Sequence, residues 1–339
     1  MVLYLIGGGL GGKGSLTHDA EEALRECDIV YVDSYTSMWS EDFLLYVKDI
    51  VKKMVVADRK ILEDGANSIV NEAYSKLVGV LAPGDPLIAT THAALWALAV
   101  RKNVGVKIVN GVSIISAAIS VSGLHVYKFG KIATIPKADE VEMYVQPLLT
   151  LEENLSRGLH TLFLLDTAGG GLTACAAVEN LLQAARLMRR EVFRDDMLSI
   201  VVAKLGSEDA LVKACLAKDI VSLSLPQPPH CLIIPSSLHF SEREIVKTYA
   251  LSPEVLDKAA AVNPFVSRVN KYVEKCRIVL NYVSKHRSLE EYVNYVKSYV
   301  EDAEKFMQSG DMMNSLLSIG YAEGLLDALR LMKEVDFKW

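Results

Sequence analysis

The stretch Gly84-Asp85-Pro86-Leu87-Ile88-Ala89-Thr90-Thr91-His92 decides which fold this chain is expected to adopt. The short apolar run of residues 77–82 precedes it and predicts a buried strand. Residues 93–101 follow it, are rich in alanine and leucine, and predict a helix with Thr90 or Thr91 as its N-cap. Ligands of open α/β sheets bind at the carboxyl ends of strands and near helix N-termini. The turn is therefore either part of a ligand site or an ordinary connection between a strand and a helix.

The composition limits the classes of protein that this chain can represent. It has 339 residues, 51% of them hydrophobic, which suffices for two compact domains and an appendage. The formal charge of −6 predicts no general attraction to nucleic acid or to an anionic membrane. Because no apolar run reaches the length of a membrane span, we expect a cytoplasmic protein. The five cysteines form no CxxC pair and the seven histidines show no metal-ligand spacing, so we expect no metal site.

The first third of the chain predicts an α/β domain. Apolar runs at residues 2–6, 29–32, 53–57, 77–82 and 104–109 predict five strands that alternate with helices. This order is typical of a parallel sheet with right-handed crossovers. The glycine-rich run at residues 7–14 satisfies GxGxxG, and Asp33 could be the acidic residue of a dinucleotide site, but the polar segment after the run disfavours that interpretation.

A second α/β domain is expected to begin near Ser113. This serine is the expected N-cap of a helix over residues 114–121. Its strands are expected at residues 132–136, 160–165, 197–205 and 231–235. Helices are expected at residues 141–157 and 172–190, the second of them with Arg186, Arg189 and Arg190 near its C-terminus, where cations are favourable.

From about Pro264 glycine and proline become rare, and apolar residues recur at helical spacing. This composition and spacing predict about three helices, with Ser288 and Asp311 as N-caps. Tyrosines at positions 292, 295 and 299 form one stripe, which we interpret as part of a helical core.

Several motifs occur in order along the chain. They include Leu3-Tyr4-Leu5-Ile6-Gly7, Gly9-Leu10-Gly11, Ser34-Tyr35-Thr36-Ser37, Ala57-Asp58-Arg59, Gly84-Asp85-Pro86-Leu87, Tyr127-Lys128-Phe129-Gly130, Leu205-Gly206-Ser207 and Pro228-Pro229-His230. Over roughly residues 1–251 the chain resembles the diphthine synthase family, a group of the tetrapyrrole-methylase-like methyltransferases that use S-adenosylmethionine.

This resemblance implies an architecture and a set of cofactor contacts. It implies two α/β domains, residues 1–112 and 113–262, with S-adenosylmethionine in the cleft between them. Residues 263–339 form a helical appendage that resembles an archaeal domain of unknown function. Carried over by position, the cofactor-binding residues are Leu10, Asp85, Ile88, Ser113, Ile114, Leu165, Leu205 and His230.

The resemblance also implies an activity. The chain is expected to be an N-methyltransferase that successively methylates the amino group of a modified histidine on translation elongation factor 2, in diphthamide biosynthesis. It is expected to act as a homodimer in an archaeal cytoplasm. The alternatives are a tetrapyrrole (precorrin-type) methyltransferase and a non-catalytic binding module of the same fold.

The sequence assigns no catalytic base and no substrate-binding residue. An α-amino group has a pKa of about 7.7–8.0, so modest desolvation leaves much of it neutral and able to attack without a base. His92 and His230 are the candidate bases, but we interpret His92 as a hydrogen-bonding residue at a helix start and His230 as a cofactor contact. For the appendage, docking to the substrate protein or to ribosomal machinery competes with a role in packing or dimerisation.

Overall fold

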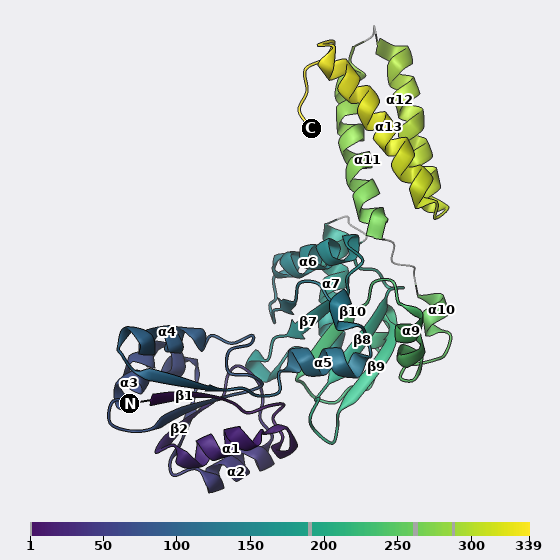
Figure 1. Ribbon diagram of the computed structural model, residues 1–339. Coiled ribbons are helices and arrows are strands. Elements are labelled where there is room, and N and C mark those ends of the chain that lie inside the picture. The colour runs from purple at the N-terminus through teal and green to yellow at the C-terminus, as the bar shows by residue number, and fades with distance from the viewer. Residues whose placement is uncertain (1, 189–191, 260–263, 287–288) are drawn as a thin grey trace. The chain divides into compact units, whose positions relative to one another are not determined.

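The computed structural model describes residues 2–188, 192–259, 264–286 and 289–339 of the chain. These residues form two compact units (Figure 1). The first unit, Met1–Leu151 with His160–Ala260, contains two five-stranded sheets. The second unit, Glu152–Leu159 with Ala261–Trp339, contains three long helices. Among the described residues, no helix combines the length and the apolar character needed to cross a membrane.

The first sheet is parallel, as the alternation of strands and helices predicts. Its strands are β1 (Val2–Gly7), β2 (Ile29–Asp33), β3 (Met54–Ala57), β4 (Val78–Ala82) and β5 (Gly105–Val109), in the order β3-β2-β4-β1-β5. Strands β1 and β4 are neighbours, with Gly7 paired to Ala82. The carboxyl ends of these two strands therefore lie together, and so do the glycine-rich run and the turn at Gly84 that follow them.

Helices cover both faces of this sheet (Figure 1). They are α1 (His18–Glu26) and α2 (Glu41–Ile50) on one face, with α3 (Ala66–Glu72), preceded by a π-helical turn (Lys60–Asp64), and α4 (Ala93–Arg101) on the other. Alternate residues of β1 explain the arrangement, because successive side chains of a strand point to opposite faces. Leu3 and Leu5 belong to the core with α3 and α4, whereas Tyr4 and Ile6 belong to the core with α1 and α2.

One of the two predicted helix caps in this region is confirmed. Ser113 caps α5 (Ile114–Ser122), and its Oγ accepts a hydrogen bond from the backbone N of Ile115 at 3.2 Å. The prediction that Thr90 or Thr91 caps α4 is wrong, because His92 occupies that position without a side-chain cap. The Thr90 hydroxyl instead donates to the Pro86 carbonyl, and the Thr91 hydroxyl lies 2.7 Å from the hydroxyl of Tyr35.

The second sheet is mixed, with the order β6-β7-β10-β8-β9. Its strands are β6 (Ala133–Ile135), β7 (Thr161–Leu165), β8 (Leu198–Ala203), β9 (Leu211–Leu216) and β10 (His230–Ile234). Only β6 and β7 run parallel, and the remaining neighbours are antiparallel. Strand β9 has no counterpart in the sequence-based expectations.

Two helices beside this sheet, α6 (Val145–Ser156) and α7 (Ala174–Leu187), follow the predicted segments with shorter ends. Three more were not predicted: α8 (Ala217–Ile220), α9 (Phe240–Lys247) and α10 (Val255–Lys258). Short 3-10 turns occur at Lys13–Ser15, Val126–Lys128, Val141–Tyr144 and Ala168–Gly170. Arg189 and Arg190, expected at the end of α7, lie outside the described residues.

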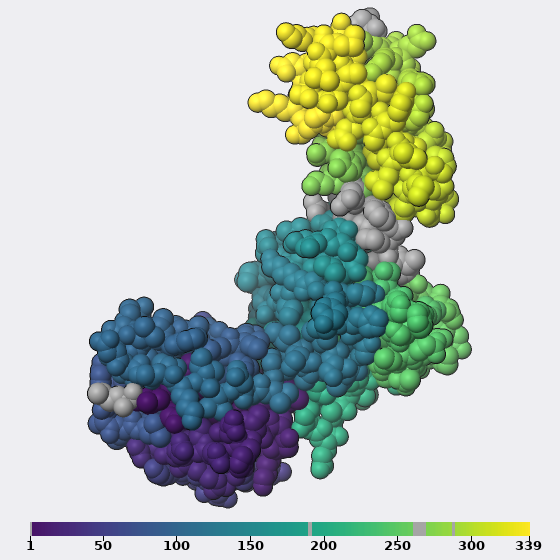
Figure 2. Space-filling view, in the orientation of Figure 1, coloured from purple at the N-terminus to yellow at the C-terminus, as the bar shows by residue number. Residues whose placement is uncertain are grey.

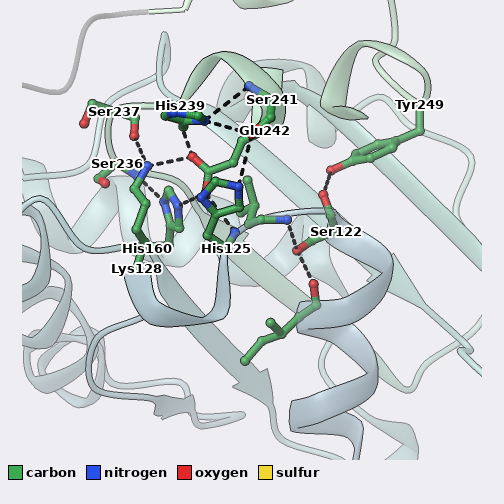
Figure 3. Close-up of polar contacts among 12 residues, drawn as sticks. Ser122, His125, Lys128, His160, Ser236, Ser237, His239, Ser241, Glu242 and Tyr249 are labelled. Carbon is green, nitrogen blue, oxygen red and sulfur yellow. Dashed lines mark hydrogen bonds and ion pairs between the residues drawn. The ribbon is translucent and has the colours of Figure 1, made fainter. Parts of the chain in front are cut away.

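A buried carboxylate ties α9 to the rest of its domain (Figure 3). The side chain of Glu242 is fully buried and accepts hydrogen bonds from Lys128 Nζ at 2.6 Å and from the backbone N of His125 and His239 at 2.8 and 2.7 Å. His160 Nε2 lies 3.1 Å from the same carboxylate. Glu242 thus joins the segment after α5, the residue before β7 and the start of α9.

The second unit is a three-helix bundle of α11 (Pro264–Val283), α12 (Glu290–Gln308) and α13 (Met312–Leu331), with its own apolar core. Asp311 caps α13 as expected, accepting from Asn314 N at 3.1 Å, whereas Ser288 lies outside the described residues. The tyrosines at positions 292 and 299 pack against the core, but the one at position 295 is half exposed, so the core interpretation holds for two of the three.

Candidate active site

A cavity of about 220 Å³ lies in the first unit and is lined from both sheets. From the segments that follow strands of the first sheet it is lined by Gly9, Leu10, Gly11, Thr36, Ser37, Met38, Pro83, Gly84, Ile88, Ala89, Ser113 and Ile114. From the second domain it is lined by Thr134, Leu164, Leu165, Asp166, Thr167, Val202, Leu205, Pro229, His230 and Cys231. Most of these residues follow the carboxyl ends of strands, which is where open α/β sheets bind ligands.

Two glycines with left-handed backbone hold the first-domain wall of the cavity together. Gly9 and Gly84 both have a φ of +70° and exchange two backbone hydrogen bonds, of 2.7 and 3.1 Å. A Cβ on Gly9 would lie 2.3 Å from the Ser15 carbonyl oxygen. The glycine at position 9 therefore lets the residue Ser15, later in the same loop, pack closely against the backbone that follows β1.

Seven of the eight predicted cofactor residues line this one cavity. They are Leu10, Ile88, Ser113, Ile114, Leu165, Leu205 and His230. They come from positions spread over more than 200 residues of sequence, and the fold brings them together. Their role as cofactor contacts remains a prediction, but their convergence supports it.

The eighth predicted residue, Asp85, does not line the cavity. Its side chain is buried, and its carboxylate accepts hydrogen bonds from the backbone N of Leu87 at 3.0 Å and from Asn110 Nδ2 at 2.9 Å. Asp85 thus shapes the turn that contains Gly84 and Ile88 and connects it to the residue after β5. The family resemblance placed Asp85 among the cofactor residues, but it could not show which way its carboxylate points.

His230 is held in one protonation state by its backbone contacts. Its Nδ1 accepts a hydrogen bond from Ala174 N at 3.1 Å, so its Nε2 carries the hydrogen and donates to the Pro226 carbonyl at 2.8 Å. Burial lowers the pKa of this imidazole, which favours the same neutral form. Because both ring nitrogens are engaged, His230 offers the cavity its ring and backbone rather than a proton acceptor.

His92, the other candidate base, lies behind the cavity wall. It is almost fully buried, with Nε2 3.2 Å from Asp33 Oδ2 and Nδ1 3.3 Å from the Pro86 carbonyl. Asp33 also accepts from the backbone N of Tyr35 and Thr36. Burial raises the pKa of Asp33, but hydrogen bonds, the first of them from His92, outweigh it and hold that pKa below its usual value. Asp33 is therefore an internal acceptor, not the ribose-binding acid of a dinucleotide site.

The sequence-based list omitted the polar groups at the second-domain edge of the cavity. Asp166 follows β7, and its carboxylate accepts from Ala168 N at 2.9 Å and from Lys137 N at 3.2 Å. The Thr167 hydroxyl donates to the Thr36 carbonyl at 2.9 Å, which links the loops after β7 and β2. The position of Asp166 directly after a strong strand was the signal that could have identified it, as it identified Asp85.

Comparison with known proteins agrees with this geometry. The family described as Tetrapyrrole (Corrin/Porphyrin) Methylases matches residues 2–221, and a protein family of unknown function (DUF357) matches residues 265–334. Diphthine synthase of Methanosphaera stadtmanae is 35% identical over 255 residues, which are 74% of this chain and 96% of that protein. Diphthine synthase of Staphylothermus marinus is 39% identical over 248 residues, 70% of this chain and 90% of that protein.

The similarity extends to a solved structure. A crystal structure of diphthine synthase superposes with a TM-score of 0.68 at 32% identity, covering 77% of this chain and 100% of that chain. The expected α/β fold with a helical appendage is thereby confirmed. The chain belongs to the tetrapyrrole methylases and, within them, to the diphthine synthase family.

Proposed function

We propose that this chain transfers methyl groups from S-adenosylmethionine, in successive steps, to the amino nitrogen of a modified histidine on translation elongation factor 2. It thereby serves as the methyltransferase of diphthamide biosynthesis. The observation that carries the proposal is the convergence of seven predicted cofactor positions on one cavity, in a chain of the diphthine synthase family.

The cavity fits S-adenosylmethionine in its chemistry. Leu10, Ile88, Ile114, Leu165 and Leu205 supply apolar surface suited to an adenine ring. Ala89, with a backbone φ of +56°, also lies in the cavity wall, and a turn of this kind can present peptide groups to a polar ligand. The residues that would hold the cofactor are therefore these five with Ser113 and His230. When bound, S-adenosylmethionine supplies an electrophilic methyl group on a sulfonium centre.

The residues of the chain would then position a neutral amine and exclude water. An α-amino group with a pKa of about 7.7–8.0 is partly neutral near pH 7.5, and desolvation increases the neutral fraction. Such an acceptor needs no imidazole base, which agrees with the engaged nitrogens of His230. The thiol of Cys231 is not a nucleophile there, because burial raises its pKa to about 12. Asp166 would stabilise the positive charge of the methylated nitrogen.

We also propose that the protein is a homodimer of an archaeal cytoplasm. Its similarity to curated relatives from archaea such as Methanosphaera stadtmanae and Staphylothermus marinus supports the archaeal source. The dimer is tested by the solution mass of the chain.

The test is a methylation assay on the full chain. Labelled S-adenosylmethionine is incubated with archaeal elongation factor 2 that carries the aminocarboxypropyl-histidine intermediate, with unmodified factor as the control. Methylation of the modified factor alone supports the proposal, and mass spectrometry counts the methyl groups. Cofactor binding without transfer would refute it and favour a tetrapyrrole acceptor, the class for which the matching family is named, to be tested with corrinoid precursors.

Two matched variants connect the activity to the cavity. Leu205→Arg places a long cation in the cavity and is expected to abolish cofactor binding, measured by calorimetry. Leu187→Arg changes a residue that is 66% exposed on α7 and is expected to leave binding and transfer unchanged. Equal behaviour of the two variants would show that the cavity is not the cofactor site.

A further inference from the structure

The outer face of α13 differs from that of α12. Helix α13 packs into its bundle through buried residues such as Ile319 and Leu326. Its opposite face carries Met313, Leu317, Tyr321 and Leu331, which are exposed by 77, 65, 50 and 71%. In Figure 2 the atoms of the yellow, C-terminal part of the chain form much of the visible surface of this unit.

These residues form one continuous stripe along the helix. Positions 313, 317, 320, 321, 324, 328 and 331 recur at the spacing of one helical face, opposite the buried residues. None of them is charged, and the whole segment 312–322 contains no charged residue. On α12, by contrast, Lys297 pairs with Glu301 and Lys305 with Asp302 at the surface. Single exposed apolar residues are ordinary, but an uncharged stripe of this length marks an interaction surface.

Two glycines in the stripe are not explained by the bundle itself. Gly320 and Gly324 lie one turn apart in the middle of α13, and a Cβ at either position would meet no atom within 4 Å. Neither residue has the positive φ that favours glycine. Each glycine costs a helix about 1 kcal/mol relative to alanine. Their presence is explained by a second helix that crosses α13 closely at this point.

We propose that this face, which we call the α13 stripe, packs antiparallel against the α13 stripe of a second copy of the chain. A two-fold axis midway between Gly320 and Gly324 falls at the centre of Met312–Leu331. It would set Met313 of one copy opposite Leu331 of the other. The glycines would meet where the helices cross, and the bulky apolar residues would meet on either side.

The helix dipoles complement this pairing. The negative end of each helix dipole faces the positive end of the other in an antiparallel pair. Because the stripe itself is uncharged, a second copy meets no repulsion along it. An interface of this kind is isologous, as a two-fold axis requires.

The size of the stripe limits the strength of the contact. A helix of this length spans about 30 Å, so the pair would bury roughly 600 Å² in total, below the roughly 1,200 Å² of a stable interface. We therefore expect a dissociation constant of about tens of micromolar for the isolated contact. Any other contact that holds two chains together would raise its occupancy through effective concentration.

Cross-linking of exposed positions tests the pairing in the full chain. A Met313→Cys chain and a Leu331→Cys chain are mixed at about 100 µM, above the expected dissociation constant, and treated with a short bis-maleimide. We expect the mixture to give at least ten times more cross-linked dimer than either chain alone. The unmodified chain gives the background, which is small because four of its five cysteines are buried.

A matched pair of variants shows whether the α13 stripe is responsible. Leu317→Glu in both chains is expected to reduce the cross-linked dimer at least tenfold. Ile278→Glu is the control, because Ile278 is 64% exposed on α11, as Leu317 is 65% exposed on α13. This control is expected to leave the yield unchanged.

Three results would overturn the proposal. The first is no cross-link above background, as expected if the α13 stripe is covered by the same chain or by another protein. The second is self-linking of Met313→Cys, which indicates a parallel pair. The third is an equal loss of cross-link with Ile278→Glu.

Discussion

Replacing Glu242 by glutamine isolates the energetic role of the buried network that ties α9 to its domain. The carboxylate accepts from four donors, two at each oxygen: the backbone N of His125 and His160 Nε2 at Oε1, and Lys128 Nζ and the backbone N of His239 at Oε2. An amide has one oxygen, so Glu242→Gln leaves two donors facing an NH₂ group. Two lost hydrogen bonds to a charged group cost about 3 kcal/mol.

The ionisation of Glu242 gives an independent estimate of the same size. Burial raises its pKa, but the hydrogen bonds, the first of them from Lys128, lower it to about 2 from an ordinary 4.5. A carboxylate with a lowered pKa stabilises the fold above its ordinary pKa and loses that effect as pH falls toward its folded pKa. The contribution of Glu242 is thus about 3 kcal/mol at pH 7 and about 2 kcal/mol at pH 3.5.

Hydrogen exchange measured by mass spectrometry resolves this effect within the full chain, where a single unfolding transition is not expected. For peptides that cover α9, Glu242→Gln should speed exchange about a hundredfold at pH 7 and about thirtyfold at pH 3.5, each relative to the parent chain at the same pH. Glu244→Gln on the same helix is the matched control, because Glu244 is 70% exposed and pairs with Lys247 at the surface. This control should change the free energy of opening of α9, calculated from the exchange rates, by less than about 0.5 kcal/mol.

The reasoning fails if Glu242→Gln changes exchange no more than Glu244→Gln does. It also fails if the difference between Glu242→Gln and the parent chain grows, rather than shrinks, as pH falls from 7 to 3.5. The first result would show that water or another side chain replaces the lost acceptor. The second would show that the carboxylate is not the ionising group.

Three further predictions concern the cavity. Asp85→Ala is expected to weaken S-adenosylmethionine binding at least about tenfold in calorimetry, because Asp85 shapes the turn that carries Ile88, and an unchanged affinity would show that binding does not depend on this turn. Asp166→Asn is expected to lower kcat about tenfold, because the carboxylate stabilises charge on the acceptor nitrogen, and to leave cofactor affinity within about twofold. A loss of cofactor affinity with unchanged kcat would contradict that role. The value of kcat/KM is expected to rise with pH to a plateau through one ionisation of the acceptor amine, and a second ionisation that disappears in His230→Asn would identify an imidazole base instead.

The first sheet could be predicted almost completely because its information is local. Each parallel strand is a short apolar run between turn residues, and each run ends where the chain must turn into a helix. The seven cavity residues, by contrast, were assigned by position from the family resemblance. The wrong helix cap shows the limit of local information. Thr90 has a suitable side chain, but its hydroxyl bonds to Pro86 four residues earlier, and His92 takes the cap position before a helix that begins at Ala93, as predicted.

Strand β9 and the direction of the Asp85 carboxylate depended on contacts distant in sequence. The residues of β9 alternate poorly and contain Lys213, so only their antiparallel pairing with β8 defines them as a strand. Asp85 is oriented by Asn110, which follows a different strand of the sheet. A one-dimensional pattern specifies that an acid stands after a strand, but the neighbouring strands decide whether it faces the ligand or the protein.

The histidines of the first unit show why a suitable side chain near a cavity is weak evidence for acid–base catalysis. His230 and His160 each accept a backbone hydrogen bond at Nδ1, which places the hydrogen on Nε2, where a carbonyl or a carboxylate accepts it. Burial lowers the pKa of both imidazoles. The two rings are thus fixed as neutral connectors between segments of the chain. A site built in this way has to rely on the ionisation of its substrate, and its own contribution lies in the shape of the cavity and in the carboxylate at its edge.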